Sequence, residues 1–438
     1  MITPEHRPRI LVLNDQMPFS DQIPNLGDRA HQCGLRTLAE RCGGVELVSG
    51  TWKPFPYRDE RAYRRAGADP RVFVAWERRA RNYSATRAAV EARVLRWLPQ
   101  WLPTGLMNRL DAVARRHTGL DLIAALAPRF LRAYHARAFM AQLATARLAL
   151  FNGGGLLADH LGRYLPERLF QLYLAKRAGL TVAAVNYSVS LGREDYRALA
   201  APVLRSLDWH LVREPLSRAQ LLELGVNPTR VAVVHDAAFY APLGYWPVSG
   251  GEPALAMGIM VRGDRPVDLD AWAALVEALR RRFGVEVHFF QGCRKHDPPI
   301  RAALGRRCQL ADDGRFVDYP ELVAHLRSLR LLITERYHGV VFAALAGTPV
   351  VPVVATTSKT DGLLTLLDYP LRPLPPLPHA AVADYLKACA WALAHRESLS
   401  RQLAAAARRA RDRLRDDYAR LFRALVGSDS GDSRVESL

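Results

Sequence analysis

Short apolar segments alternate with longer amphipathic ones along most of this chain, in two successive runs. The first run predicts buried strands, each followed by a helix, over residues 9–14, 45–48, 148–152, 181–186, 209–212 and 231–234. A stretch rich in Gly and Pro, residues 242–253, interrupts the pattern. The second run predicts strands over residues 254–261, 286–290, 315–317, 331–334 and 350–354. Such alternation is typical of parallel sheets covered by helices on both faces.

The length of the chain agrees with two such units, because a single core stops growing at roughly 250–300 residues and this chain has 438. We expect an α/β protein of two Rossmann-like, doubly wound domains that face one cleft, over residues 1–245 and 253–425. The second domain ends in helices after residue 380, and residues 426–438 are expected to form a disordered tail.

Residues 52–146 break the alternation and predict a helical insertion in the first domain. Its apolar positions recur near helical spacing, so it packs against the domain or, through the surface around Arg96, Trp97 and Trp101, contacts a membrane.

Composition narrows the class of protein further. The five cysteines are scattered and form no C-x-x-C pair, which argues against a disulfide framework and a structural zinc. No apolar run approaches the roughly 20 residues of a membrane span, so we expect a soluble, cytoplasmic protein. The net charge of +18 is nearly all arginine. It would attract a polyanion, or it forms a solvated basic face without a dedicated partner.

Candidate functional residues follow the predicted strands, because ligands of open α/β sheets bind at the carboxyl ends of the strands. Arg336, Tyr337 and His338 come directly after strand 331–334 and open a helix, which places a guanidinium, an imidazole and free backbone N–H groups together. Each residue could also be a packing or loop-capping group. The other basic residues at strand ends are Arg213, Arg262 and Lys359.

Two segments of the first domain rich in Gly and Asn also follow predicted strands. Asn25-Leu26-Gly27-Asp28 and Asn152-Gly153-Gly154-Gly155 precede helices, where glycine permits close backbone approach to a ligand; Asp28 suits a helix N-cap. Neither matches the glycine spacing of nicotinamide or Walker-type nucleotide sites, and no metal-binding motif appears. Asp236 is a weaker candidate, for which a helix cap is the preferred interpretation.

Taken together, these motifs resemble the polysaccharide pyruvyl transferase family. The resemblance covers most of residues 9–50, 148–240 and 254–370. It rests on the order of six motifs: Asn25-x-Gly27-Asp28, Gly153-Gly154-Gly155-Leu156, Val212-Arg213-Glu214, His235-Asp236, Arg336-Tyr337-His338-Gly339-x-x-x-Ala343 and Lys359-Thr360-x-Gly362-Leu363.

The resemblance implies a glycosyltransferase-B-like pair of domains, the first on the acceptor side and the second on the donor side. Phosphoenolpyruvate would be the donor and a sugar or lipid-linked saccharide the acceptor, giving a pyruvate ketal and free phosphate. His338 would be the general acid–base, with Asp28 as a second candidate for the group that removes the acceptor proton. The residues expected to bind substrate are Arg213, Arg336, Tyr337, Lys359, Arg262, Asn25, Gly153, Gly154 and Gly155.

No metal, cofactor or nucleic acid is expected, and peripheral contact with the inner face of a membrane stays open as an alternative. Two alternatives stay open. A nucleotide-sugar-dependent glycosyltransferase would need an acidic residue to hold a ribose, for which Glu335 is the weak candidate. A non-catalytic polyanion-binding protein would use the basic charge alone and would not require His338.

Overall fold

The computed structural model describes residues 7–13, 25–50, 139, 141–161, 164–244, 255–311, 314–354 and 359–429. Nearly all of the predicted insertion, including Arg96, Trp97 and Trp101, lies outside these ranges, as do most of the predicted linker and the end of the predicted tail.

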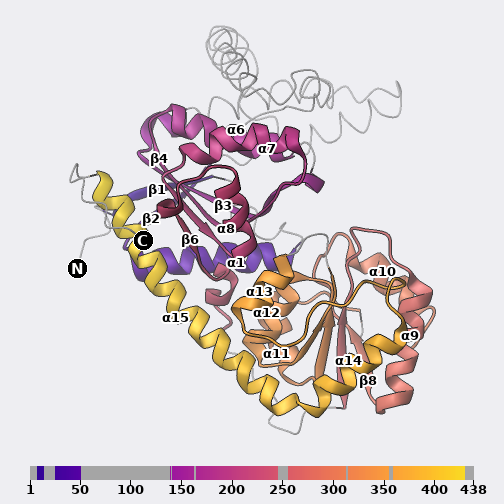
Figure 1. Ribbon diagram of the computed structural model, residues 1–438. Helices are drawn as coiled ribbons and strands as arrows, with labels where there is room; N and C mark the ends of the chain where they lie inside the picture. Colours follow the sequence, from indigo (N-terminus) through magenta and orange to yellow (C-terminus); the bar gives the residue numbers. More distant parts are fainter. Residues whose placement is uncertain are drawn as a thin grey trace, which may run out of the picture.

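The first half of the chain forms a six-stranded sheet in the order β2-β1-β3-β4-β5-β6, with all neighbouring strands parallel. Its strands are β1 (Arg9–Leu13), β2 (Glu46–Ser49), β3 (Leu148–Ala158), β4 (Thr181–Ser190), β5 (Trp209–Val212) and β6 (Val231–Val233). The central strands read as continuous apolar runs because helices cover both faces of the sheet, as Figure 1 shows.

The second half forms a four-stranded parallel sheet in the order β10-β9-β7-β8. Its strands are β7 (Ala256–Met260), β8 (Glu286–Phe289), β9 (Leu331–Thr334) and β10 (Val350–Pro352). The strand predicted over residues 315–317 is wrong: this segment is irregular, and the described part of the second sheet has four strands. Two parallel sheets with covering helices confirm the predicted fold class.

Each sheet reverses the direction of its winding once, which creates a ligand-binding crevice at the carboxyl ends of the strands. In the first sheet the reversal falls between β1 and β3, and in the second between β7 and β9. Arg262 and Arg336 stand two residues beyond the ends of β7 and β9, so the topology itself brings these arginines together.

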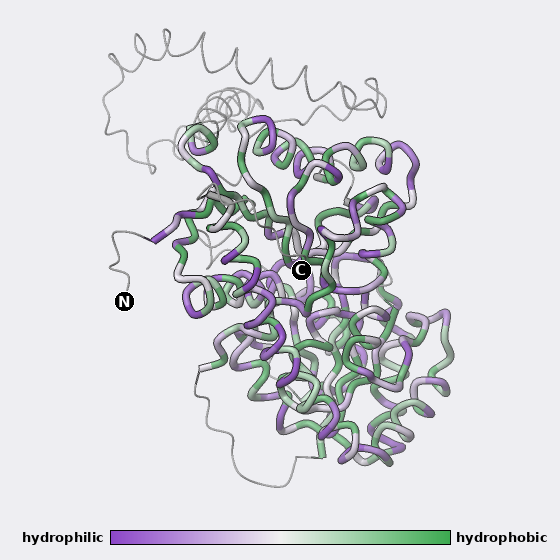
Figure 2. Tube along the Cα trace, turned by 60° about the vertical axis from the view of Figure 1, so that its left-hand side comes forward, coloured by the Kyte–Doolittle hydropathy of each residue, from purple (hydrophilic) through white to green (hydrophobic). Residues whose placement is uncertain are grey.

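Helices surround both sheets, and hydrophobic stretches of the trace concentrate inside the two halves (Figure 2). The first domain carries α1 (Leu26–Leu38), η3 (Ala39–Gly43), η4 (Asp159–Leu161), α6 (Tyr164–Arg177), α7 (Glu194–Ser206), α8 (Pro215–Glu223), η5 (Pro228–Arg230) and η6 (Ala237–Tyr240). The second carries α9 (Leu269–Phe283), α10 (Asp297–Gly305), α11 (Tyr319–Arg327), α12 (Tyr337–Ala346), α13 (Lys359–Leu366), α14 (Val382–Ala394) and α15 (Arg396–Asp429). Of the described helices, none is long and apolar enough to cross a membrane.

The long helix α15 ties the two halves together. It starts in the second domain, packs on α12 and runs back along η6 and η3 of the first domain (Figure 1). A stripe of buried residues at helical spacing, from Leu399 through Leu414 to Leu425, joins the core of both halves. The helix continues to Asp429, beyond residue 425, where the sequence predicts its end.

Helix α1 forms the other junction. Its N-cap is Asn25, whose Oδ1 accepts from the backbone N–H groups of Gly27 and Asp28, so the prediction of Asp28 as the cap is wrong. The backbone N–H of Leu26, the first residue of α1, donates to Gly292 O of the second domain at 3.0 Å. The start of α1 is thereby fixed against the carboxyl end of the second sheet.

Candidate active site

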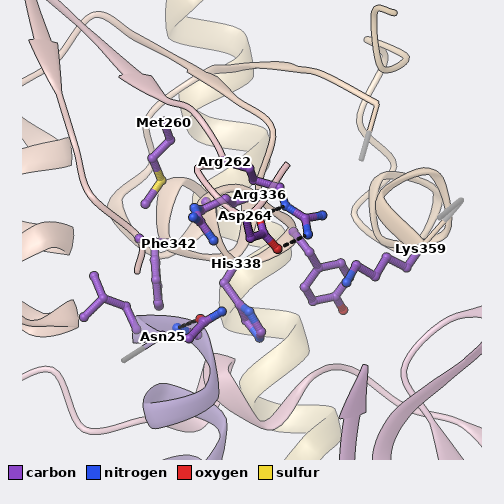
Figure 3. A pocket seen from close by; sticks show the side chains of 13 residues that line it. Asn25, Met260, Arg262, Asp264, Arg336, His338, Phe342 and Lys359 are labelled. Atoms are coloured by element: carbon purple, nitrogen blue, oxygen red, sulfur yellow. Dashed lines mark hydrogen bonds and ion pairs between the residues drawn. The ribbon is translucent and has the colours of Figure 1, made fainter. Parts of the chain in front are cut away.

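A cavity of about 90 Å³ lies where the start of α1 meets the carboxyl ends of β7 and β9. Its walls come from both domains: Figure 3 shows Asn25 of the first domain beside His338, Arg262 and Lys359 of the second. The lining residues are Asn25, Leu26, Gly27, Met260, Arg262, Asp264, Gly292, Arg336, Tyr337, His338, Gly339, Phe342 and Lys359. The sequence predicts six of these as site residues: Asn25, Arg262, Arg336, Tyr337, His338 and Lys359.

Arg336 is the N-cap residue of α12 and is held in place from behind. Its Nη2 donates to Asp297 Oδ1, while Asp297 Oδ2 accepts from the backbone N–H groups of Gly292 and Cys293 at 2.8 Å. Gly292 is required here, since a Cβ at this position would overlap the Arg336 side chain. The guanidinium is therefore oriented before any ligand arrives.

Three successive residues at the start of α12 each keep a buried polar atom without a hydrogen-bond partner among the described residues. These atoms are Arg336 Nε, Tyr337 Oη and His338 Nε2. Buried polar groups normally have partners because an unmade hydrogen bond costs about 1–3 kcal/mol. A run of three at a helix N-terminus, which itself favours anions, indicates a polar ligand site.

His338 crosses the boundary between the domains. Its Nε2 lies 3.4 Å from Oδ2 of Asp236, which caps η6 of the first domain through Ala238 N. Its ring also packs so closely on α1 that a Cβ at Gly27 would overlap it. This contact explains why glycine occupies position 27.

The same carboxylate also binds Arg213. Arg213 Nη1 donates to Asp236 Oδ2 at 2.6 Å, and its Nε donates to Ser188 Oγ at 2.9 Å. Its guanidinium lies over the Tyr337 ring, with Cζ 4.3 Å from the ring centroid. The sequence predicts Arg213 as a donor ligand, but its side chain is only 1% exposed and does not line the cavity. The structure places it behind the site, where its charge acts through Asp236 and Tyr337.

Opposing effects set the ionisation of the His338–Asp236 pair. Burial would raise the pKa of Asp236, but the charges of His338 and Arg213 outweigh it and hold the pKa well below its ordinary value. Burial lowers the pKa of His338; Asp236 opposes this shift and Arg213 adds to it. The pKa of His338 therefore lies below that of an exposed imidazole, and an added anion in the cavity would raise it.

Lys359 begins α13 and approaches from another side of the cavity (Figure 3). Its Nζ lies 5.9 Å from the centroid of the Tyr337 ring. Burial, followed by repulsion from Arg213 and Arg262, lowers its pKa to about 7. These neighbouring cations thus repel one another around the cavity, and an anionic ligand would lower this repulsion energy.

Arg262 lines the cavity as predicted, but its guanidinium is already paired with Asp264, at 2.9 and 2.6 Å (Figure 3). Its backbone N–H donates to Glu335 Oε2 at 2.7 Å, and Glu335 also binds Arg265 at 2.6 Å. Glu335 is 3% exposed and fully engaged in these contacts. A carboxylate committed in this way is not available to hold a ribose.

The prediction that Gly153, Gly154 and Gly155 form a turn before a helix is wrong. All three lie within β3, where they pair with β4 around an irregularity in register, and they do not line the cavity. They nevertheless lie beside the site. A Cβ at Gly155 would stand 3.6 Å from Lys359 Nζ, and Gly154, at φ +52°, lies close to His31.

Asp28 lies one residue beyond the cavity lining, with 40% of its side chain exposed. Burial raises its pKa, but the hydrogen bond with His31 and the charges of His31 and His338 lower it overall. Asp28 is thus a carboxylate at neutral pH.

The sequence does not single out His31, Ser188 or Asp297. The preferred interpretation of Asp236 as a helix cap is confirmed, because Asp236 caps η6, and the structure adds the contacts of its carboxylate with His338 and Arg213. His235-Asp236 does follow β6, so position gave a signal for Asp236. Asp297 precedes two prolines at the start of α10, and nothing in the sequence around it indicated a functional role. Among the described residues, no cluster of His, Cys, Asp or Glu could hold a metal ion.

Comparison with known proteins decides the family. A sequence model described as polysaccharide pyruvyl transferase matches residues 25–357, three quarters of the chain, including both walls of the cavity. The chain belongs to the polysaccharide pyruvyl transferase family. This confirms the resemblance predicted from the motifs, and the protein is a transferase. No curated protein sequence matches it.

Solved structures similar to this pyruvyl transferase family member include sugar-nucleotide enzymes. A putative UDP-N-acetylglucosamine 2-epimerase from Listeria monocytogenes has a TM-score of 0.52 at 14% identity, covering 99% of both chains. The S. aureus MnaA–UDP structure has a TM-score of 0.52 at 12% identity, covering 98% of this chain and 99% of the other. Similarity at this level shows the fold, a glycosyltransferase-B-like pair of domains.

Proposed function

We propose that the protein transfers the enolpyruvyl-derived group of phosphoenolpyruvate to two hydroxyls of a sugar in a polysaccharide or its precursor. The products are a pyruvate ketal and free phosphate. The observation that carries the proposal is the pair of unpartnered polar atoms, Arg336 Nε and Tyr337 Oη, beside the imidazole of His338 and the cation of Lys359. A small ligand with a carboxylate and a phosphate matches both the orphan donors and the positive charge.

In this proposal the anionic groups of the donor bind Arg336, Lys359 and the N-terminus of α12. Binding raises the pKa of His338, because a negative charge stabilises the imidazolium. His338 then delivers a proton to C3 of the donor, and the hydroxyl oxygen bonds to C2. Asp236 holds the ring of His338 and stabilises its charged form, and Arg213 fixes Asp236. Arg213 is thus a positioning residue.

A thermal-shift assay with matched ligands tests the proposal. Phosphoenolpyruvate is expected to raise the Tm, and UDP is not. Arg336→Ala should abolish the shift because it removes a donor contact. His338→Ala should keep the shift but lose phosphate release by ~10²–10⁴-fold, the usual contribution of a positioned acid–base.

Stabilisation by UDP without any effect of phosphoenolpyruvate would instead favour a nucleotide-sugar-dependent glycosyltransferase. Binding that resists both substitutions and disappears with added salt would favour a polyanion-binding protein. The engagement of Glu335 by Arg265 and the Arg262 backbone counts against the glycosyltransferase.

A further inference from the structure

A second histidine–carboxylate pair lies beside the first. His31 and Asp28 are one turn apart on α1, with His31 Nε2 3.6 Å from Asp28 Oδ1. The His31 ring stacks on that of His338, at a centroid distance of 6.0 Å and an interplanar angle of 21°. Two imidazoles, each with its own carboxylate, therefore stand face to face at the domain boundary.

His31 is buried and keeps an unpartnered polar atom, which is typical of a functional residue and not of a surface histidine. The residue is 3% exposed, yet its Nδ1 has no hydrogen-bond partner among the described residues. Gly154 makes room for it: a Cβ there would stand 3.2 Å from His31 Nε2, and the backbone adopts a positive φ of 52°. The glycine run of β3 thus accommodates a buried histidine next to the site.

Ketal formation requires proton transfers at several positions around C2, and one imidazole held in a fixed orientation cannot reach all of them. Two acceptor hydroxyls each lose a proton; one proton is gained by donor C3, and the other ends on the released phosphate. In the first step protonated His338 gives its proton to C3 and the first hydroxyl oxygen bonds to C2. The proton of that hydroxyl passes to the imidazole of His338, which is then neutral. In the second, the C2–O bond to phosphate breaks, its electron pair leaves with the phosphate, and the second hydroxyl oxygen bonds to C2. The second hydroxyl reaches C2 from a different direction and needs its own base.

We propose that Asp28 accepts the proton of the second hydroxyl and that His31 is its positioning residue. This inference rests on the proposed function. Asp28 belongs to the first domain, is half-buried with 40% of its side chain exposed, and is anionic, so it can contact a hydroxyl that His338 does not. His31 orients the carboxylate and takes up the proton at Nε2 as the new C–O bond forms, and the proton then passes to the departing phosphate.

The test separates the two steps. Methyl glucoside, methyl galactoside and methyl mannoside serve as acceptors with phosphoenolpyruvate in D₂O. Three quantities are measured: deuterium at C3, free phosphate and ketal. The native protein should form one ketal for each phosphate released.

In Asp28→Asn and His31→Gln, the first addition should continue, so deuterium incorporation and phosphate release persist. Water then intercepts C2 in place of the second hydroxyl and yields pyruvate. Ketal formation should fall by ~10²-fold, the contribution expected of a lost base. His325→Gln is the matched control, because His325 pairs with Glu321 at 3.4 Å on the surface of α11.

Equal losses of deuterium incorporation, phosphate and ketal in the two variants would overturn the inference, as would an unchanged ratio of ketal to phosphate. A fall in that ratio cannot result from partial unfolding, which lowers all three quantities together; Asp28→Asn, at a partly exposed position, guards against misfolding of His31→Gln. If the native protein releases no phosphate with any of the three glycosides, the proposed function itself fails, and the second pair loses its role with it.

Discussion

Lys359 carries a charge that depends on whether the cavity is occupied. In the free protein, burial and the neighbouring Arg213 and Arg262 lower its pKa to about 7 from an ordinary 10.5. A bound phosphoenolpyruvate would reverse this shift, because the negative charge stabilises the ammonium. Donor binding should then take up a proton at Lys359 at mildly alkaline pH, and the affinity should fall as pH rises above 7.

The size of the effect follows from the two ionisation states. With a pKa of about 7 in the free site and a much higher one in the complex, donor affinity should fall about eightfold from a pH of about 7.5 to about 8.5. At the lower pH Lys359 should take up about three quarters of a proton per donor bound, in addition to the uptake at His338. The phosphate of the donor contributes little in this range because its second pKa is about 6.

Isothermal titration calorimetry in two buffers of different ionisation enthalpy measures both quantities. Lys359→Gln should bind more weakly and lose the part of the pH dependence and of the proton uptake that comes from Lys359, whereas the part that comes from His338 should remain. Lys295→Gln, which changes an exposed lysine, should behave as the native protein does. The reasoning is refuted if the native protein takes up no proton, or if Lys359→Gln keeps the native pH slope.

Other substitutions test the contacts that build the site. Gly27→Ala inserts a methyl group into the His338 ring and should reduce kcat by ~10²-fold through misplacement of that ring. Gly305→Ala, whose Cβ would stand 3.8 Å from Arg301 and 3.9 Å from Leu310, should leave kcat unchanged. Asp236→Asn leaves the buried Arg213 without its counter-charge and should lower the free energy of unfolding by about 3–5 kcal/mol in urea denaturation; a loss no larger than that of Asp264→Asn, whose carboxylate is 36% exposed, would contradict this account. Asn25→Ala removes the cap of α1 and should lower the Tm by an amount equivalent to ~1 kcal/mol, with Asn25→Ser restoring most of it.

The amino-acid sequence by itself determined the two runs of parallel strands, since apolar runs and helical periodicity are local properties of the chain. It also located Arg336, Tyr337, His338 and Lys359, because residues at the carboxyl ends of parallel strands meet at one edge of the sheet whatever the details of packing. The N-cap of α1 at Asn25 escaped prediction because Asn25 and Asp28 both suit a cap and lie three residues apart. The strand conformation of Gly153–Gly155 escaped prediction because it depends on pairing with β4, which is distant in the chain.

Only the tertiary structure decided which charged side chains lie beside the cavity and which ones hold those side chains in place from behind. Arg213 and Arg336 look alike in sequence, each at a strand end before a helix. Yet Arg213 is closed in between Asp236 and Tyr337, whereas Arg336 keeps Nε free beside the cavity. The partners that make this difference, Asp236 and Asp297, come from segments 23 and 39 residues away. His338 likewise meets Asp236 and Gly27 only across the domain boundary, because docking of the two sheets, and not local sequence, brings them together.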